Sequence, residues 1–126
     1  MSQARLHYTE ISVSKGSETQ FVDRSRPIPT QDYAPPAPPV GLGILTDQSR
    51  VIVVSFPKGL TYEVFHPAPK HQWAVIVSGR IELGVSDGET RKFNAGSVLN
   101  IKDMGSKGHT TRVVGEEDVM MLVSEY

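Results

Sequence analysis

The chain of 126 residues fits a single domain that can bury a core of its own. Its 13 basic residues nearly balance 14 acidic ones and are scattered, which argues against nucleic acid and membrane surfaces as partners. Cysteine is absent, which excludes disulfide bonds and thiolate chemistry. No apolar run approaches the roughly 18 residues of a membrane span, and the first residues do not resemble a signal peptide. We therefore expect a soluble, cytoplasmic protein.

Residues 1–49 are polar and show only weak periodicity. Two short strands are predicted there, at residues 5–11 and 20–24, followed by a proline-rich stretch at residues 32–39. Because proline fixes φ and biases its predecessor toward extended backbone, this stretch should be polyproline-like. A ligand for an aromatic groove is one interpretation. A stiff strap packed on the rest of the domain, anchored by Tyr33 and Val40, is the favoured one.

Residues 50–126 are predicted to form one strand after another. Residues 50–56 are almost continuously apolar and β-branched, which suggests a strand buried on both sides. Asp87-Gly88 is a typical two-residue hairpin turn. The predicted strands are residues 50–56, 60–66, 71–77, 80–86, 90–93, 98–101, 109–114 and 118–124. Short strands at regular spacing, with no helical period, predict an all-β barrel or sandwich built as a single domain.

Three histidines, His66, His71 and His109, fall at strand ends beside loops. Strand alternation sorts the neighbouring side chains into an inward and an outward set. The predicted interior consists of Tyr62, Val64, His66, Gln72, Ala74, Ile76, His109, Thr111 and Val113. This mixture, mostly apolar with a few polar groups, is typical of a small-molecule pocket. Trp73 should face the other way and pack under the strap or at a dimer interface.

The spacing of several of these residues resembles the two motifs of the cupins. Residues 66–79 read HPAPKHQ, six further residues and a glycine, which is similar to the first motif. Residues 96–109, from a glycine to a histidine, are similar to the second. Ala68 stands in place of the second histidine of the first motif, and Gln72 in place of its glutamate. The resemblance covers residues 50–126 and implies a double-stranded β-helix, the jelly-roll barrel of small single-domain cupins.

Metal-binding cupins offer three imidazoles and a carboxylate, a ligand set that suits Mn, Fe, Ni or Zn. This chain keeps His66 and His109, with the neutral amide of Gln72 as a third donor. His71 is adjacent to Gln72, so it should point to the opposite face of the strand. A divalent metal held by His66, Gln72 and His109 stays open as an alternative, but we expect no cofactor.

The same residues suit acid–base catalysis. Histidine gives and takes protons near neutral pH, so His66 and His109 could act as general base and general acid. Gln72 could orient a substrate or hold an oxyanion. Asp103 could fix the tautomer of His109 or act as a base; its alternative role is to form the turn. His71 could meet an anionic substrate at the mouth, or simply be solvated. The residues predicted to bind substrate are Tyr62, Val64, His71, Ala74, Ile76 and Thr111.

Three classes of function follow. The favoured one, which the resemblance also implies, is a metal-independent enzyme that moves protons on a small organic substrate. A cyclase, isomerase, dehydratase or decarboxylase of secondary-metabolite biosynthesis would fit. The alternatives are a metal-dependent oxygenase with a reduced ligand set and a non-catalytic binding module. The resemblance also implies a homodimer, for which the apolar segment 119–123 is a candidate edge, although it could equally be a central strand.

Overall fold

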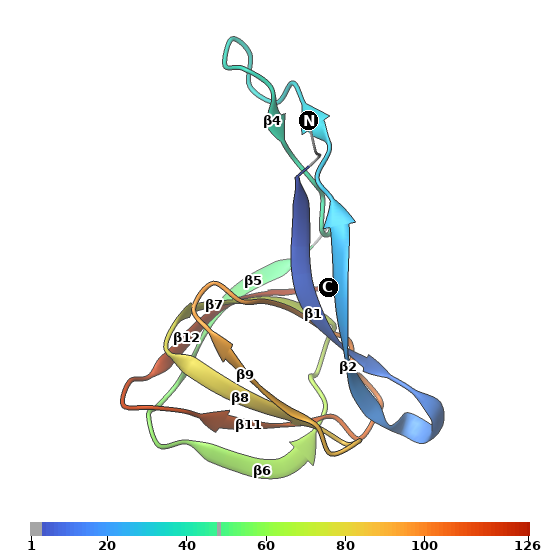
Figure 1. Cartoon of the computed structure of the whole chain (residues 1–126), viewed down its shortest axis with the longest axis vertical. Helices are drawn as coiled ribbons and strands as arrows, with labels where there is room; N and C mark the ends of the chain where they lie inside the picture. Colours follow the sequence, from blue (N-terminus) through green and yellow to red (C-terminus); the bar gives the residue numbers. More distant parts are fainter. Residues whose placement is uncertain (1–3, 48) are drawn as a thin grey trace.

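The computed structural model describes residues 4–47 and 49–126, and the regular secondary structure of this part of the chain is almost entirely β-strand (Figure 1). A single turn of 3₁₀ helix, Lys15–Ser17, joins the first two strands. The strands are β1 Arg5–Val13, β2 Thr19–Pro27, β3 Thr30–Gln31, β4 Val40–Gly41, β5 Arg50–Phe56, β6 Thr61–His66, β7 Gln72–Ser78, β8 Arg80–Val85, β9 Thr90–Asn94, β10 Val98–Ile101, β11 His109–Val113 and β12 Val119–Glu125.

Two sheets face each other and enclose the core. The larger has the strand order β2-β1-β10-β7-β12-β5, and the smaller has the order β6-β11-β8-β9. Figure 1 shows the two sheets curving around a common interior, the arrangement of a jelly-roll barrel. The all-β prediction is thereby confirmed. The eight strands predicted in residues 50–126 are all present, with their ends within one residue of the predicted positions. In the described residues, no helix is long and apolar enough to cross a membrane.

The first two strands are longer than their sequence pattern predicted. β1 and β2 pair over nine antiparallel positions, from Arg5 with Pro27 to Val13 with Thr19. β1 also runs parallel to β10, with Ile11 opposite Ile101. Pairing and burial against the sheet extend both strands beyond what local propensity indicates. Strands β1 and β2 are thus an integral part of the larger sheet.

The proline-rich stretch does not pack on the barrel, which corrects the predicted strap. Figure 1 shows the segment between β2 and β5 standing away from the sheets; we call residues 28–49, without Gln48, the arm. The predicted anchors are both exposed, Tyr33 to 70%. Within the arm, β3 and β4 pair at only two positions. Prolines lack the N–H donors that a sheet would need, so the stretch cannot add a strand to the barrel.

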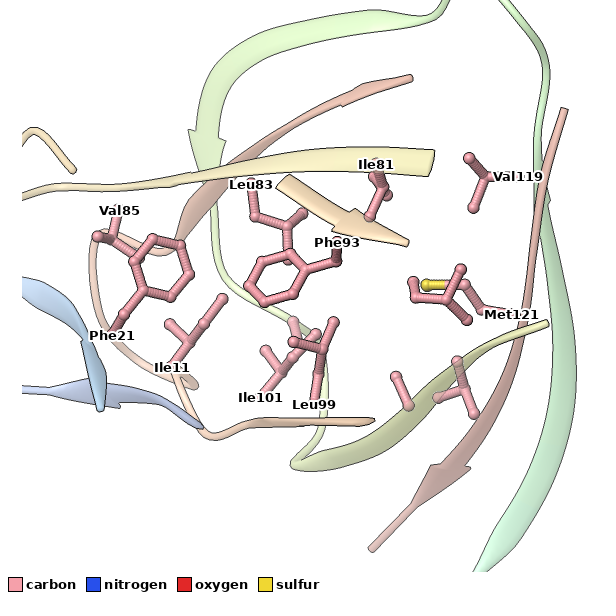
Figure 2. Packing of buried hydrophobic residues seen from close by; sticks show 14 of the residues in the cluster. Ile11, Phe21, Ile81, Leu83, Val85, Phe93, Leu99, Ile101, Val119 and Met121 are labelled. Atoms are coloured by element: carbon pink, nitrogen blue, oxygen red, sulfur yellow. The ribbon is translucent and has the colours of Figure 1, made fainter. Parts of the chain in front are cut away.

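The core lies between the two sheets. In Figure 2, side chains from opposite walls meet in the interior, with Phe21 and Phe93 approaching from β2 and β9. Their ring centroids are 6.0 Å apart at an interplanar angle of 56°. Ile11 and Val85 fill the same end of the barrel, and both are fully buried. The cavity described below begins beside this packed region, since its lining residues Ile101 and His109 pair with Ile11 and Val85.

Strand β5 is an edge strand, which corrects the prediction that it is buried on both sides. It pairs with β12 alone. Its inward side chains Ile52, Val54 and Phe56 pack against the core. Its outward side chains Val51 and Val53 are exposed because no second layer covers this face in the described chain. The apolar run in the sequence thus gives the strand two apolar faces, and the fold covers only the inward one.

Candidate active site

A cavity of about 430 Å³ opens between the two sheets. This volume lies within the roughly 300–1,000 Å³ of typical small-molecule sites. The lining residues are Val54, Phe56, Leu60, Tyr62, His66, Ala68, Pro69, Gln72, Ile81, Leu83, Leu99, Ile101, His109, Thr111, Met121 and Val123. None of these residues carries a carboxylate, an ammonium or a guanidinium group. The cavity is therefore an apolar receptacle whose polar groups are two imidazoles, an amide and two hydroxyls.

A buried histidine–aspartate pair forms the centre of the polar part. His109 Nδ1 lies 2.6 Å from Asp103 Oδ2, and both side chains are buried. The second carboxylate oxygen of Asp103 accepts a hydrogen bond from the Ala68 backbone N–H at 2.9 Å. Because both oxygens are held, the carboxylate fixes the His109 ring through Nδ1 and leaves Nε2 as the nitrogen available to a ligand. The structure thus places Asp103 where it can set the tautomer of His109.

His66 stands beside His109. The two residues are paired across β6 and β11, and their ring centroids are 4.9 Å apart. His66 Nδ1 lies 3.2 Å from the Val64 carbonyl oxygen. A carbonyl can only accept, so Nδ1 carries a proton and Nε2 is again the free nitrogen. The Tyr62 ring meets the His66 ring edge-on at 4.9 Å.

Gly108 makes this approach possible. Its backbone has φ +83°, a conformation that L side chains rarely adopt. A Cβ at this position would come within 2.1 Å of the His66 carbonyl carbon and 2.3 Å of Pro67 N. The loop before β11 can therefore lie directly against the end of β6 only with glycine here. The contact brings the two imidazoles into one site.

Val64 does not line the cavity, contrary to the prediction. The pairing of β6 with β11 is irregular: His66 lies opposite His109, and Tyr62 lies opposite Thr111. Three residues of β6 therefore span the distance that a single residue spans on β11. They arch outward as a bulge, and Val64 is 66% exposed. Tyr62 and Thr111 both line the cavity, as predicted.

Four further predictions of placement need correction. Ala74, Ile76 and Val113 point inward but are buried in the packed core and do not line the cavity. Alternation gives the correct face, but it does not say how far along the barrel the open space extends. His71 lies outside the cavity and packs its ring against Tyr126 at a centroid distance of 5.7 Å. It is therefore not placed to meet a substrate there.

Trp73 faces outward from the barrel, but its partners differ from those predicted. Its ring packs edge-on against Tyr8 at 4.8 Å, and the Arg26 guanidinium lies 5.2 Å from the Trp73 ring centroid. Strands β1 and β2 thus supply the cover that was expected from the proline-rich strap or from a dimer partner.

Sequence reasoning missed the hydrogen bonds that support the loop before β11. Thr19, fully buried, donates a hydrogen bond from Oγ1 to the Gly108 carbonyl at 2.7 Å and accepts one from Ser86 N–H at 2.9 Å. Glu18 joins the same network through Lys107 and Ser86. The hydrogen bond from Lys107 holds the pKa of Glu18 below its ordinary value. No local signal marks these residues, because the network joins segments that are far apart in the sequence.

The sequence also indicated only weakly which apolar residues line the cavity. Val54 and Phe56 from β5, together with Met121 and Val123 from β12, line the cavity opposite the imidazoles. Alternation places Val54 with Phe56 on one face of β5, and Met121 with Val123 on one face of β12. However, the opposite face of each strand is also largely apolar. The pattern alone therefore does not distinguish the cavity side from the outer side.

The donor set does not fit a tightly bound divalent metal of the cupin kind. His66, His109 and Gln72 all line the cavity. Asp103, the carboxylate in contact with His109, lies behind that ring and is engaged by its Nδ1 and by Ala68 N–H. Across residues 4–47 and 49–126, no group of three or more His, Cys, Asp or Glu could hold a metal. Two neutral imidazoles and an amide provide no negative charge for a dication.

The facing sheets and the cavity between them define a small jelly-roll barrel. No protein-family model and no curated protein sequence matches the chain. Among solved structures, the chain is similar to the cupin domain of Cnp3 from Schizosaccharomyces pombe, with 14% identity and a TM-score of 0.48. That match covers 98% of this chain and 83% of the other. It is also similar to an ethanolamine utilization protein Q of Salmonella typhimurium, with 15% identity and a TM-score of 0.42, covering 100% and 98% of the two chains.

Proposed function

We propose that the protein is a metal-independent enzyme that moves protons on a neutral, largely apolar small molecule. The observation that carries this proposal is the buried Asp103–His109 pair, with Asp103 Oδ2 and His109 Nδ1 2.6 Å apart, facing His66 inside the cavity. An aspartate behind a histidine fixes which nitrogen takes the proton and compensates the charge of the imidazolium that forms.

The proposed step is an enolisation. His109 Nε2 takes a proton from a carbon next to a carbonyl group, while protonated His66 gives a proton to the carbonyl oxygen. One C–H bond breaks and one O–H bond forms, so that the products are the enol, a protonated His109 and a neutral His66. Reversal with the proton delivered to another carbon gives an isomerase. Attack or elimination from the enol gives a cyclase or a dehydratase.

The chemistry of the lining supports the choice of substrate class. A buried charge needs a partner of opposite sign, and the cavity lining offers no fixed charge. Carboxylates and phosphates are therefore poor substrates. A molecule with a carbonyl or hydroxyl group at one end and a hydrocarbon body fits better. Its polar end would meet His66, His109 and Gln72, and its body would contact the apolar wall.

Hydrogen–deuterium exchange tests the proposal without knowledge of the natural substrate. Neutral ketones with a carbon–hydrogen bond next to the carbonyl, such as 2-tetralone, are first screened for binding by ligand-observed NMR. Ligands that bind are then incubated with the protein in D₂O, and deuterium uptake is followed by mass spectrometry. We expect protein-dependent exchange that falls at least roughly a hundredfold in His109→Ala and in His66→Ala, the scale of general acid–base catalysis.

His71→Ala is the matched control, because it removes the same side chain from outside the cavity. It should exchange at the wild-type rate. Ligands that bind in the cavity but exchange equally fast with wild-type protein and His109→Ala would contradict catalysis. That result would favour the binding-module alternative.

A further inference from the structure

The outer face of the larger sheet is apolar where polar residues are expected. A sheet with one face in water normally alternates between apolar inward and polar outward side chains. On β5, β7 and β12 the outward positions carry no charge at all. The exposed apolar side chains there, which we call the outer patch, are Val51, Val53, Val75, Val77, Met120 and Leu122.

The arm is the second uncovered apolar feature. Tyr33, Val40, Ile44 and Leu45 are exposed along it, and Figure 1 shows it projecting clear of the barrel. It leaves the barrel at the end of β2 and rejoins it at the start of β5, the edge strand of the outer patch. Its charged side chains are Asp32 and Asp47, both acidic.

We propose that a second copy of this chain covers the outer patch, with the arm of each copy lying across the patch of the other. The exposed fractions of 39–67% in the patch correspond to roughly 500 Å² per chain at ordinary residue areas, near the top of the range for a monomer surface. The apolar side chains of the arm add roughly 400 Å². The total exceeds the roughly 800 Å² per partner that a standard stable interface buries.

A second copy fits both features at once. A two-fold interface is self-complementary, so a chain that carries both an apolar arm and an apolar face supplies each with its partner. A different protein would need to match both features independently.

The first test is the mass of the full chain in solution. Sedimentation equilibrium at micromolar concentration should give twice the 13.8 kDa of one chain. Val51→Glu should raise the dimer dissociation constant at least about thirtyfold, the scale of a central interface residue. Val64→Glu is the matched control, because Val64 has the same side chain, the same exposure and a place on the edge strand of the other sheet. It should leave the dimer intact.

The second test asks where the arm lies and uses the absence of natural cysteine. Tyr33→Cys and Leu122→Cys chains are prepared separately, mixed and treated with a short bis-maleimide. We expect a covalent dimer that contains one chain of each variant. Its yield should be well above the yield of covalent dimer when either variant is mixed with the cysteine-free chain.

The outcomes separate clearly. The proposal is overturned if the chain is still monomeric at about 100 μM. It is also overturned if Val51→Glu and Val64→Glu weaken the dimer equally. A dimer broken by Val51→Glu but without the arm–patch cross-link overturns the exchange of arms. None of these measurements depends on the activity proposed for the cavity.

Discussion

The two faces of strands β5, β7 and β12 are both apolar, yet one face is buried and the other is exposed. The inward face meets side chains from the opposite sheet, and the cavity beside it reaches His109, which is hydrogen-bonded to the buried Asp103. The outward face carries the six exposed apolar side chains of the outer patch. The difference teaches that apolar character alone does not make a core. Burial also needs a second surface, which one chain provides for the inner face only.

The largest effect on stability should come from a change at the polar end of the cavity. Gly108→Ala introduces a Cβ that collides with the His66 backbone and forces a strained φ, so the free energy of unfolding should fall by about 3 kcal/mol or more. Urea denaturation measures it. Gly59→Ala is the control, since Gly59 has φ +82° but nothing within 4 Å, and it should cost only about 1 kcal/mol. Equal losses would mean that the contact with His66 is unimportant.

A pair of leucines tests the two faces directly. Leu99 is fully buried and lines the cavity, so Leu99→Ala should lower the free energy of unfolding by about 2–3 kcal/mol. Leu122→Ala removes the same atoms from the outer patch and should cost less than about 1 kcal/mol in the dilute, monomeric chain. Urea denaturation at low protein concentration compares them. A Leu122→Ala loss as large as that of Leu99→Ala would show that something within the chain covers the patch.

The hydrogen bonds that support the loop before β11 should contribute somewhat less to stability. Thr19→Val leaves the Gly108 carbonyl and the Ser86 N–H without their buried partner, which should cost about 2 kcal/mol. Thr9→Val removes an exposed hydrogen bond to Asp23 and should change stability by less than about 0.5 kcal/mol. Thermal or urea unfolding of both variants is sufficient. If the two behave alike, the loop is held by other contacts.

The smallest effect should be a dependence on pH. The folded state holds the pKa of Glu18 below its ordinary value of 4.5, chiefly through Lys107, so the carboxylate stabilises the fold above that pH. Its contribution is lost as the pH falls through the lowered pKa. The melting temperature of wild-type protein should therefore exceed that of Glu18→Gln at pH 7, and the gap should shrink as the pH falls below 4.5 and through the lowered pKa. Lys107→Met should reproduce the effect, and a gap that widens in acid would contradict this assignment.

Much of the fold could be read from local patterns. The alternation in residues 80–86 and the Asp87-Gly88 turn fix their strand and hairpin because period-two patterning and turn chemistry are local properties. The same logic brought His66, Gln72 and His109 to one cavity, since strand ends and faces follow from the pattern. It failed at Val64, where a bulge in the pairing with β11 interrupts the regular strand geometry.

By itself, the sequence determined the all-β class, the strands of the second half and the residue types available for chemistry, because these depend on neighbouring residues. Only the tertiary structure decided that Asp103 orients His109, that Thr19 holds Gly108 and that the arm stands away from the barrel. Each of these depends on which distant segments meet. A run such as residues 50–56 records how apolar a strand is, but what covers each face depends on the rest of the chain and, as we propose for the outer patch, on a second copy.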